Sequence, residues 1–368
     1  MMQGTKRLSE KGNSIQEFTV LFWEDHVLID GKSIPLGQIS TEVLNYPDEQ
    51  LLALREKLNT LLQCIQTKLM NPDVQKTFSL VNETQEKLNS VLCDIFSLPL
   101  FSFLDMDREK AESMLITAFS QFPDEFQKMV TSGTAEQAIF MEYVFKLVSI
   151  PDELHSFKAY TSVLLDFYME RLKLRNPESY AVGVYDFFSN TELLNEIASS
   201  LPPCPFQFYR QTCGVMLEFT TMPHPEQKER YILAERMVFH RLGEFLHTDF
   251  FRGLMHGHTP RRCHNCGSFF LLTEGYDTRN CNRIAPAEKT RTCREIGAHH
   301  KEKAKKESRT PAKQEYDRVY NRLKTRKNRG KISAGEWNEL VAKAWELRRQ
   351  NEAGELSDEE YRKNMKKL

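Results

Sequence analysis

The sequence has no long hydrophobic run and no sign of a secretion signal. Its start, MMQGTKRLSEKGNSIQEF, lacks the apolar segment that a signal peptide carries. No stretch approaches the roughly 20 apolar residues that a membrane-spanning helix needs. We therefore expect a cytoplasmic protein without a membrane partner, in which clustered cysteines hold metal more often than they form disulfides.

Familiar catalytic motifs are also missing. Neither Gly-x-Gly-x-x-Gly, His-Glu-x-x-His nor Gly-x-Ser-x-Gly occurs. The tripeptide at 31–33, Gly-Lys-Ser, is not a phosphate-binding loop, because position 26 is His where such a loop needs Gly, and Pro35 opposes the helix that should follow. We expect no enzymatic activity, identify no catalytic residue and identify no small-molecule substrate.

Charge is distributed unevenly along the chain, although the net charge is only −1. Residues 261–368 contain 27 Lys and Arg against 16 Asp and Glu, whereas residues 1–260 contain 23 against 35. This division predicts an acidic and a basic module that face different partners.

The fold class that the pattern predicts is mainly α with a small N-terminal β-hairpin element. In residues 17–36, Phe18, Val20 and Phe22 alternate along the first half and Val27 to Ile29 leads into an Asp-Gly turn signal, which predicts two or three short strands. From Pro47 onward the leucines recur every three or four residues, as in a helix. Further helices are expected at 73–95, 107–121, 134–149, 152–174 and 176–200. A long helix is expected at 227–256, where the apolar stripe consists of Leu233, Val238, Leu242, Leu246, Phe250 and Leu254.

Four cysteines lie within one short segment, as Cys263-x2-Cys266-x14-Cys281-x11-Cys293. Gly267 completes a knuckle-type turn after the first pair, residues 269–272 form a strand, 274–277 form a turn, and Cys293 begins a helix. Four thiolates suit one structural Zn²⁺ and leave no open position for a catalytic water. The alternatives are four unrelated cysteines or two disulfides.

The C-terminal region predicts short helices with defined starts. Thr310-Pro311 begins a basic helix that runs to about Lys327. A quasi-repeat follows, in which 330–337 matches 354–361 and each copy places Ser three residues before Glu, as in a capping box. The expected organisation is a flexible tail (1–15), an acidic mostly helical domain (16–260), a four-cysteine zinc finger (261–307) of knuckle, hairpin and helix, and a basic helical tail (308–368).

The basic side chains on and around the finger predict contacts with nucleic-acid phosphates. The expected contacts are Arg261, Arg262, Arg283, Lys289, Arg291, Arg294, Lys301, Lys303, Lys305, Lys306, Arg309, Lys324, Arg326, Lys327 and Arg329. One alternative is a protein-interaction or scaffold role with a purely structural zinc. A second is a metal-dependent nuclease that uses residues such as His299 and Asp277.

The segments CHNCGSFF, CNR and TCREIGAHHKEKAK, followed by the two capping boxes, resemble an uncharacterised bacterial family. Its members join a variable, mostly helical N-terminal part to this cysteine segment, and the resemblance covers roughly 261–365. The segment is also distantly similar to zinc fingers of the Cys-Gly-Asn-Arg class, which often end bacterial transcription regulators. Here the last cysteine opens Cys-Arg-Glu-Ile instead. The resemblance implies zinc binding and a regulatory role, and no established activity.

Overall fold

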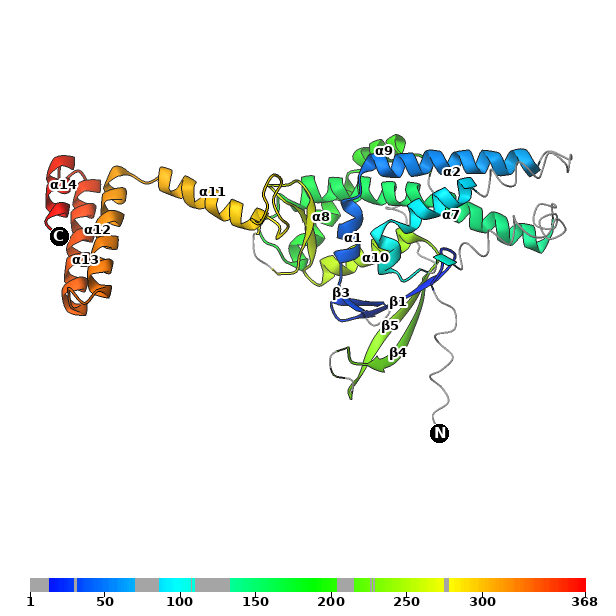
Figure 1. Ribbon diagram of the computed structural model, residues 1–368, viewed down its shortest axis with the longest axis horizontal. Helices are drawn as coiled ribbons and strands as arrows, with labels where there is room; N and C mark the ends of the chain where they lie inside the picture. Colours follow the sequence, from blue (N-terminus) through cyan, green and yellow to red (C-terminus); the bar gives the residue numbers. More distant parts are fainter. Residues whose placement is uncertain are drawn as a thin grey trace. The chain divides into compact units, whose positions relative to one another are not determined.

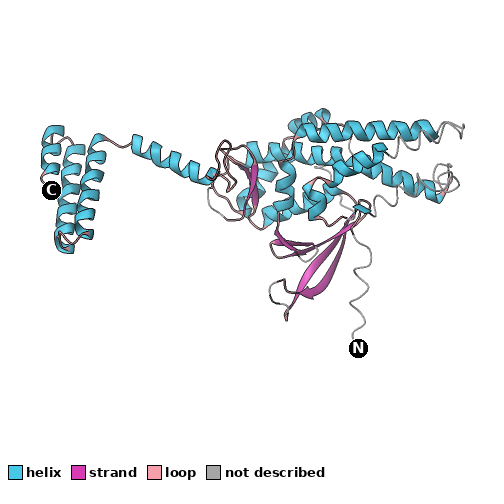
Figure 2. Cartoon of the chain, viewed as in Figure 1, coloured by secondary structure: helices cyan, strands magenta, loops and turns pink. Residues whose placement is uncertain are grey.

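The computed structural model describes residues 13–29, 32–69, 86–106, 108–109, 133–203, 215–225, 227, 229–274 and 278–368. The chain is mainly helical, as predicted (Figure 2). It divides into two compact units, Met1–Arg279 and Asn280–Leu368. Most of the predicted flexible tail, most of the helix predicted at 107–121 and the start of the one at 73–95 lie outside the described residues. Within these ranges, no helix is both long enough and apolar enough to cross a membrane.

The first unit contains a five-stranded antiparallel sheet, in the order β3-β2-β1-β5-β4 (Figure 1). Its strands are β1 (Phe18–Trp23), β2 (His26–Ile29), β3 (Lys32–Pro35), β4 (Met216–Pro223) and β5 (Tyr231–Phe239). The N-terminal strands predicted from the alternating pattern are confirmed. Phe18, Val20 and Phe22 all point into the core, because alternate side chains of a strand share one face.

The long helix predicted at 227–256 is wrong in its first half. Tyr231–Phe239 is the strand β5, which pairs with β1 and with β4, and only Leu242–Met255 is helical, as α10. Leu242, Leu246, Phe250 and Leu254 do form the buried face of α10. The apolar residues before them occur at strand positions, where pairing with two neighbours overrides a spacing that also fits a helix.

Helices pack against part of the sheet and form most of the core. Those of the first unit are α1 (Gln38–Leu44), α2 (Asp48–Leu69), α4 (Pro99–Phe103), α7 (Ala135–Val163), η1 (Leu164–Met169), α8 (Pro177–Ser189), α9 (Thr191–Ser200) and α10 (Leu242–Met255). Residues 86–96 are helical as well. Two helices separated near Pro151 were expected, but α7 continues through this proline. It then changes to the π-helix η1, where the Glu170 N–H donates to Leu165 O at 2.9 Å.

Two buried carboxylates fix the positions of helix starts in the first unit. Asp249 accepts hydrogen bonds from the N–H groups of Gly37 and Ser40, both at 2.9 Å, and so caps α1. Glu153 caps α10 in the same way, through the Gly243 N–H at 3.0 Å. Burial raises the pKa of both carboxyls, and the hydrogen bonds that they accept oppose this rise.

The second unit contains α11 (Cys293–Glu307) and a bundle of α12 (Pro311–Asn328), α13 (Ala334–Glu352) and α14 (Asp358–Lys366). Val319, Leu323, Tyr361 and Met365 form the centre of this bundle. The predicted caps are confirmed. Thr310 accepts from the Lys313 N–H, and both serines of the quasi-repeat form complete capping boxes.

Candidate metal centre

The four cysteines are brought together. The Sγ atoms of Cys263, Cys266, Cys281 and Cys293 all lie within 4.8 Å of one another. Three of these side chains are buried and that of Cys266 is partly exposed. Four sulfurs gathered at one point fit a single shared metal ion better than two disulfides. Among the described residues, this is the only group of three or more Cys, His, Asp or Glu side chains that can hold a metal ion.

A tight turn positions the first two cysteines. The Gly267 N–H donates to Cys263 O and the Cys263 N–H donates to Ser268 O, both at 2.9 Å. Gly267 has a φ of 76°, a left-handed conformation that favours glycine. Strands β6 (Thr259–Arg262) and β7 (Phe269–Leu272) flank the turn and pair with each other. The strand predicted at 269–272 is therefore confirmed, and it pairs with β6, which precedes the knuckle. Most of the turn predicted at 274–277 lies outside the described residues.

Backbone hydrogen bonds position the last two cysteines. The Cys293 N–H donates to Arg283 O at 2.9 Å, and the Arg294 N–H donates to Cys281 O at 3.0 Å. Cys293 is the first residue of α11, as predicted.

Thr292 and Glu295 close the start of α11 with a capping box. The Glu295 carboxylate accepts from the Thr292 N–H at 2.8 Å, and the Thr292 hydroxyl accepts from the Glu295 N–H at 3.2 Å. We did not predict this capping box. The same Ser/Thr-x-x-Glu signal that marks α13 and α14 is present in the sequence and identifies it.

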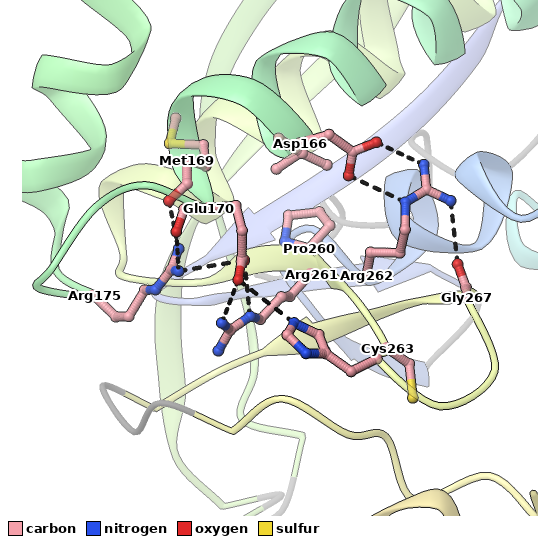
Figure 3. A pocket seen from close by; sticks show the side chains of 11 residues that line it. Asp166, Met169, Glu170, Arg175, Pro260, Arg261, Arg262, Cys263 and Gly267 are labelled. Atoms are coloured by element: carbon pink, nitrogen blue, oxygen red, sulfur yellow. Dashed lines mark hydrogen bonds and ion pairs between the residues drawn. The ribbon is translucent and has the colours of Figure 1, made fainter.

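A partly buried ion pair holds β6 against the end of the π-helix (Figure 3). The Arg261 guanidinium donates to both carboxylate oxygens of Glu170, at 3.0 and 2.6 Å, and to Thr278 O at 3.0 Å. Arg261 is 3 % exposed and Glu170 is 38 % exposed. Partial burial raises the pKa of Glu170, but the hydrogen bonds and charge of Arg261 outweigh this effect and hold the pKa below its usual value.

The next arginine forms a second pair, closer to solvent. Arg262 donates to both carboxylate oxygens of Asp166, at 3.1 and 2.8 Å, and its guanidinium lies 4.2 Å from the centre of the Phe269 ring. The two pairs border a cavity of about 370 Å³ beside the knuckle (Figure 3). Each charged side chain of these pairs has its partner in the cavity wall. The two pairs therefore hold β6 in place beside the cavity.

Asn45, at the end of α1, holds the other strand of the ribbon. Its amide donates to Phe269 O at 2.9 Å and accepts from the Phe269 N–H at 2.7 Å. Asn45, Asp166 and Glu170 are far from the cysteines in sequence, and no sequence pattern links them to the cluster.

The residues predicted to contact nucleic acid occupy different environments. Arg261 is buried in its pair with Glu170, and Arg262 is paired with Asp166. Arg309 pairs with Asp317, Arg326 donates to Leu368 O, and Lys327 lies over the Trp337 ring. The side chains of Lys305 and Lys306 lie outside the described residues. The remaining eight are exposed, namely Arg283, Lys289, Arg291, Arg294, Lys301, Lys303, Lys324 and Arg329.

The residues suggested for a metal-dependent nuclease are only partly described by the structure. His299 is exposed on α11, and Asp277 lies outside the described residues. No second group of metal-ligating side chains occurs among the described residues.

Comparison with known proteins finds a match for part of the chain. No curated protein and no solved structure matches it. Residues 210–368, which include β4, β5, the cysteine cluster and the C-terminal bundle, match a family described as being of unknown function (DUF6076).

Proposed function

We propose that this is a nucleic-acid-binding protein with one structural Zn²⁺ and a regulatory role. The observation that carries the proposal is the position of Cys293. This residue belongs to the cysteine cluster and is also the first residue of α11, an exposed helix that carries Arg294, Lys301 and Lys303. A metal bound by the cluster therefore fixes the start of a basic helix.

The donor set suits zinc. A tetrahedral Zn²⁺ with Zn–S bonds of about 2.3 Å places its sulfurs roughly 3.8 Å apart. The four Sγ atoms lie within 4.8 Å of one another, a separation that small adjustments bring to this value. Four thiolates complete the coordination, so the metal's role is to stabilise the fold.

The contacts that we propose are with phosphates. The eight exposed basic residues named above supply the positive charge. Arg261 and Arg262 form ion pairs beside the knuckle, so we no longer propose them as phosphate contacts. No described helix presents an assembled set of base-reading side chains, so sequence-independent binding is expected to dominate.

The alternative is a protein-interaction role. One observation favours it: Arg322 and Arg326 of α12 donate to backbone carbonyls at the C-terminus, and Arg309 and Lys313 pair with Asp317. These cations stabilise the bundle and are not all available to a phosphate backbone.

Salt dependence distinguishes the two roles. Anisotropy of a labelled duplex DNA and of a single-stranded RNA, titrated with the full chain from low to high KCl, should show affinity falling steeply with salt. The variant Arg294→Gln/Lys301→Gln should lower the slope of log K against log salt by roughly 2 for the duplex. The control Lys363→Gln/Lys366→Gln removes as much charge from α14 and should leave the slope unchanged. Absence of binding to both probes at low salt would contradict the proposal.

Metal content tests the zinc site separately. Purified protein should contain about one zinc per chain, and Cys263→Ser/Cys293→Ser should remove it. The matched control, Cys64→Ser/Cys93→Ser, alters two cysteines outside the cluster and should keep it. Full zinc content in the first variant would refute the ligand set.

A further inference from the structure

Strand β4 leaves one edge of the five-stranded sheet open. It pairs with β5 along its eight residues, and no other described strand pairs with it. The opposite edge of the sheet, β3, is only four residues long and ends at Pro35, which has no N–H to donate. An open edge presents unpaired N–H and C=O groups to another strand.

An apolar patch accompanies this open edge. Leu217, Phe219, Tyr231 and Leu233, which we call the hairpin patch, are between 45 and 73 % exposed. Register places them on one face of the sheet, because Leu217 lies opposite Met237, Phe219 opposite Glu235, Thr221 opposite Leu233 and Pro223 opposite Tyr231.

The hairpin patch continues the core face of the sheet. Glu235 lies opposite Phe219 on β4 and opposite Phe22 on β1, so all three side chains are on one face. Phe22 is buried beneath Arg252 of α10, which also pairs with Glu235. Beyond this pair the apolar side chains of the face are exposed in the part of the chain that the structure describes, and Figure 1 shows β4 and the adjoining part of β5 extending past α10.

The hairpin patch falls within the size range of apolar surface patches that are often functional. An aromatic side chain has roughly 150–250 Å² of surface, so Phe219 and Tyr231, each 73 % exposed, present about 300 Å² together. Leu217 and Leu233 enlarge this area. The largest patch on a monomer measures about 300–600 Å² and is often functional.

We propose that a second copy of this chain pairs with this open edge, through antiparallel pairing of β4 with β4 of the partner about a two-fold axis at Phe219, which brings the two hairpin patches together on one face of a continuous sheet. This register places Phe219 opposite its own copy, Leu217 opposite Thr221, Glu218 opposite Thr220 and Met216 opposite Met222. Every apolar side chain then meets an apolar residue or threonine.

Charge supports this register over its neighbour. An axis at Glu218 would bring two carboxylates directly opposite each other, which destabilises a strand pair. With the axis at Phe219, the two copies of Glu218 are separated, and each is held by Arg236 of its own chain at 2.7 Å. The β4 sequence has no lysine that would discourage strand addition.

Light scattering after size exclusion tests the dimer with the full chain. We expect twice the mass of one chain at micromolar concentration. Phe219→Lys should raise the dissociation constant at least about 100-fold, because it places two cations together on the axis. Tyr185→Lys, at a side chain 72 % exposed on α8, is the matched control and should leave the mass unchanged. A monomer at all concentrations, or a dimer that Phe219→Lys does not weaken, would overturn the proposal.

Cysteine cross-linking tests the register. Phe219→Cys should form a disulfide between chains under mild oxidation, because directly opposed residues have Cα atoms about 4.5–5.5 Å apart. Thr221→Cys is the control. Its two copies are offset by four residues, roughly 13 Å, and should not cross-link, whereas a mixture with Leu217→Cys should. Cross-linking of Thr221→Cys with itself would overturn the register. The dimer is independent of nucleic-acid binding, so either proposal can fail alone.

Discussion

Replacing Glu170 with glutamine tests whether the partly buried pair with Arg261 holds the knuckle. Glutamine keeps the shape of the side chain but removes the charge that neutralises Arg261, which is only 3 % exposed. Breaking a buried ion pair from one side costs about 3–5 kcal/mol. Glu170 is 38 % exposed, so water screens part of this cost, and glutamine can still accept one hydrogen bond. We therefore expect a loss of about 2 kcal/mol.

The assay is the release of metal to a chromogenic chelator. Arg261 lies two residues before Cys263, so detachment of β6 exposes the first two thiolates. A loss of about 2 kcal/mol multiplies the population of the opened state by up to roughly 30. When detachment of β6 is the rate-limiting step, metal release from Glu170→Gln should accelerate by about that factor.

A matched control is the next pair along the same strand. Asp166→Asn removes the partner of Arg262, which is 47 % exposed, and exposed pairs contribute only about 0–1 kcal/mol. Release from this variant should accelerate less than about fivefold. Equal rates for the two variants, or an unchanged rate for Glu170→Gln, would refute the reasoning.

Three further predictions concern other elements. Gly267→Ala should lower metal affinity and cost about 1–2 kcal/mol, because alanine is strained at a φ of 76°; chelator competition measures this. Asp249→Asn should destabilise the fold by about 2 kcal/mol in urea unfolding, since an amide cannot accept from both the Gly37 and Ser40 N–H groups. The Ser333 N–H holds the pKa of Glu336 below its ordinary 4.5, so the charge stabilises the bundle above that pH. The thermal advantage of wild type over Glu336→Gln should disappear as the pH falls through the lowered pKa, and an advantage that persists at pH 2 would contradict this assignment.

Local signals predicted much of the C-terminal half. The spacing of the four cysteines indicated that they share one site, because a knuckle and a helix start are formed by neighbouring residues. The helix starts at Thr310, Ser333 and Ser357 were predictable for the same reason, since a cap is completed within four residues.

Long-range pairing could not be read from the sequence. Tyr231–Phe239 is a strand because β1, about 210 residues earlier, pairs with it. The brace between Glu170 and Arg261 joins residues 91 apart, and neither side chain carries a local pattern. The phosphate contacts were likewise predicted only from the number of basic residues. The structure buries Arg261, so this side chain is not available for such a contact.

The side-chain amide of Asn45 makes the two hydrogen bonds that the backbone of a neighbouring strand would make. It satisfies both the N–H and the C=O of Phe269 on the outer edge of the β6–β7 ribbon. Among the described strands, β4 keeps a long open edge, and in the proposed dimer this self-complementary edge closes into a pair. An Asn45→Ala chain would have two different edges. Contacts between unlike edges do not close, so such a chain is prone to grow into filaments.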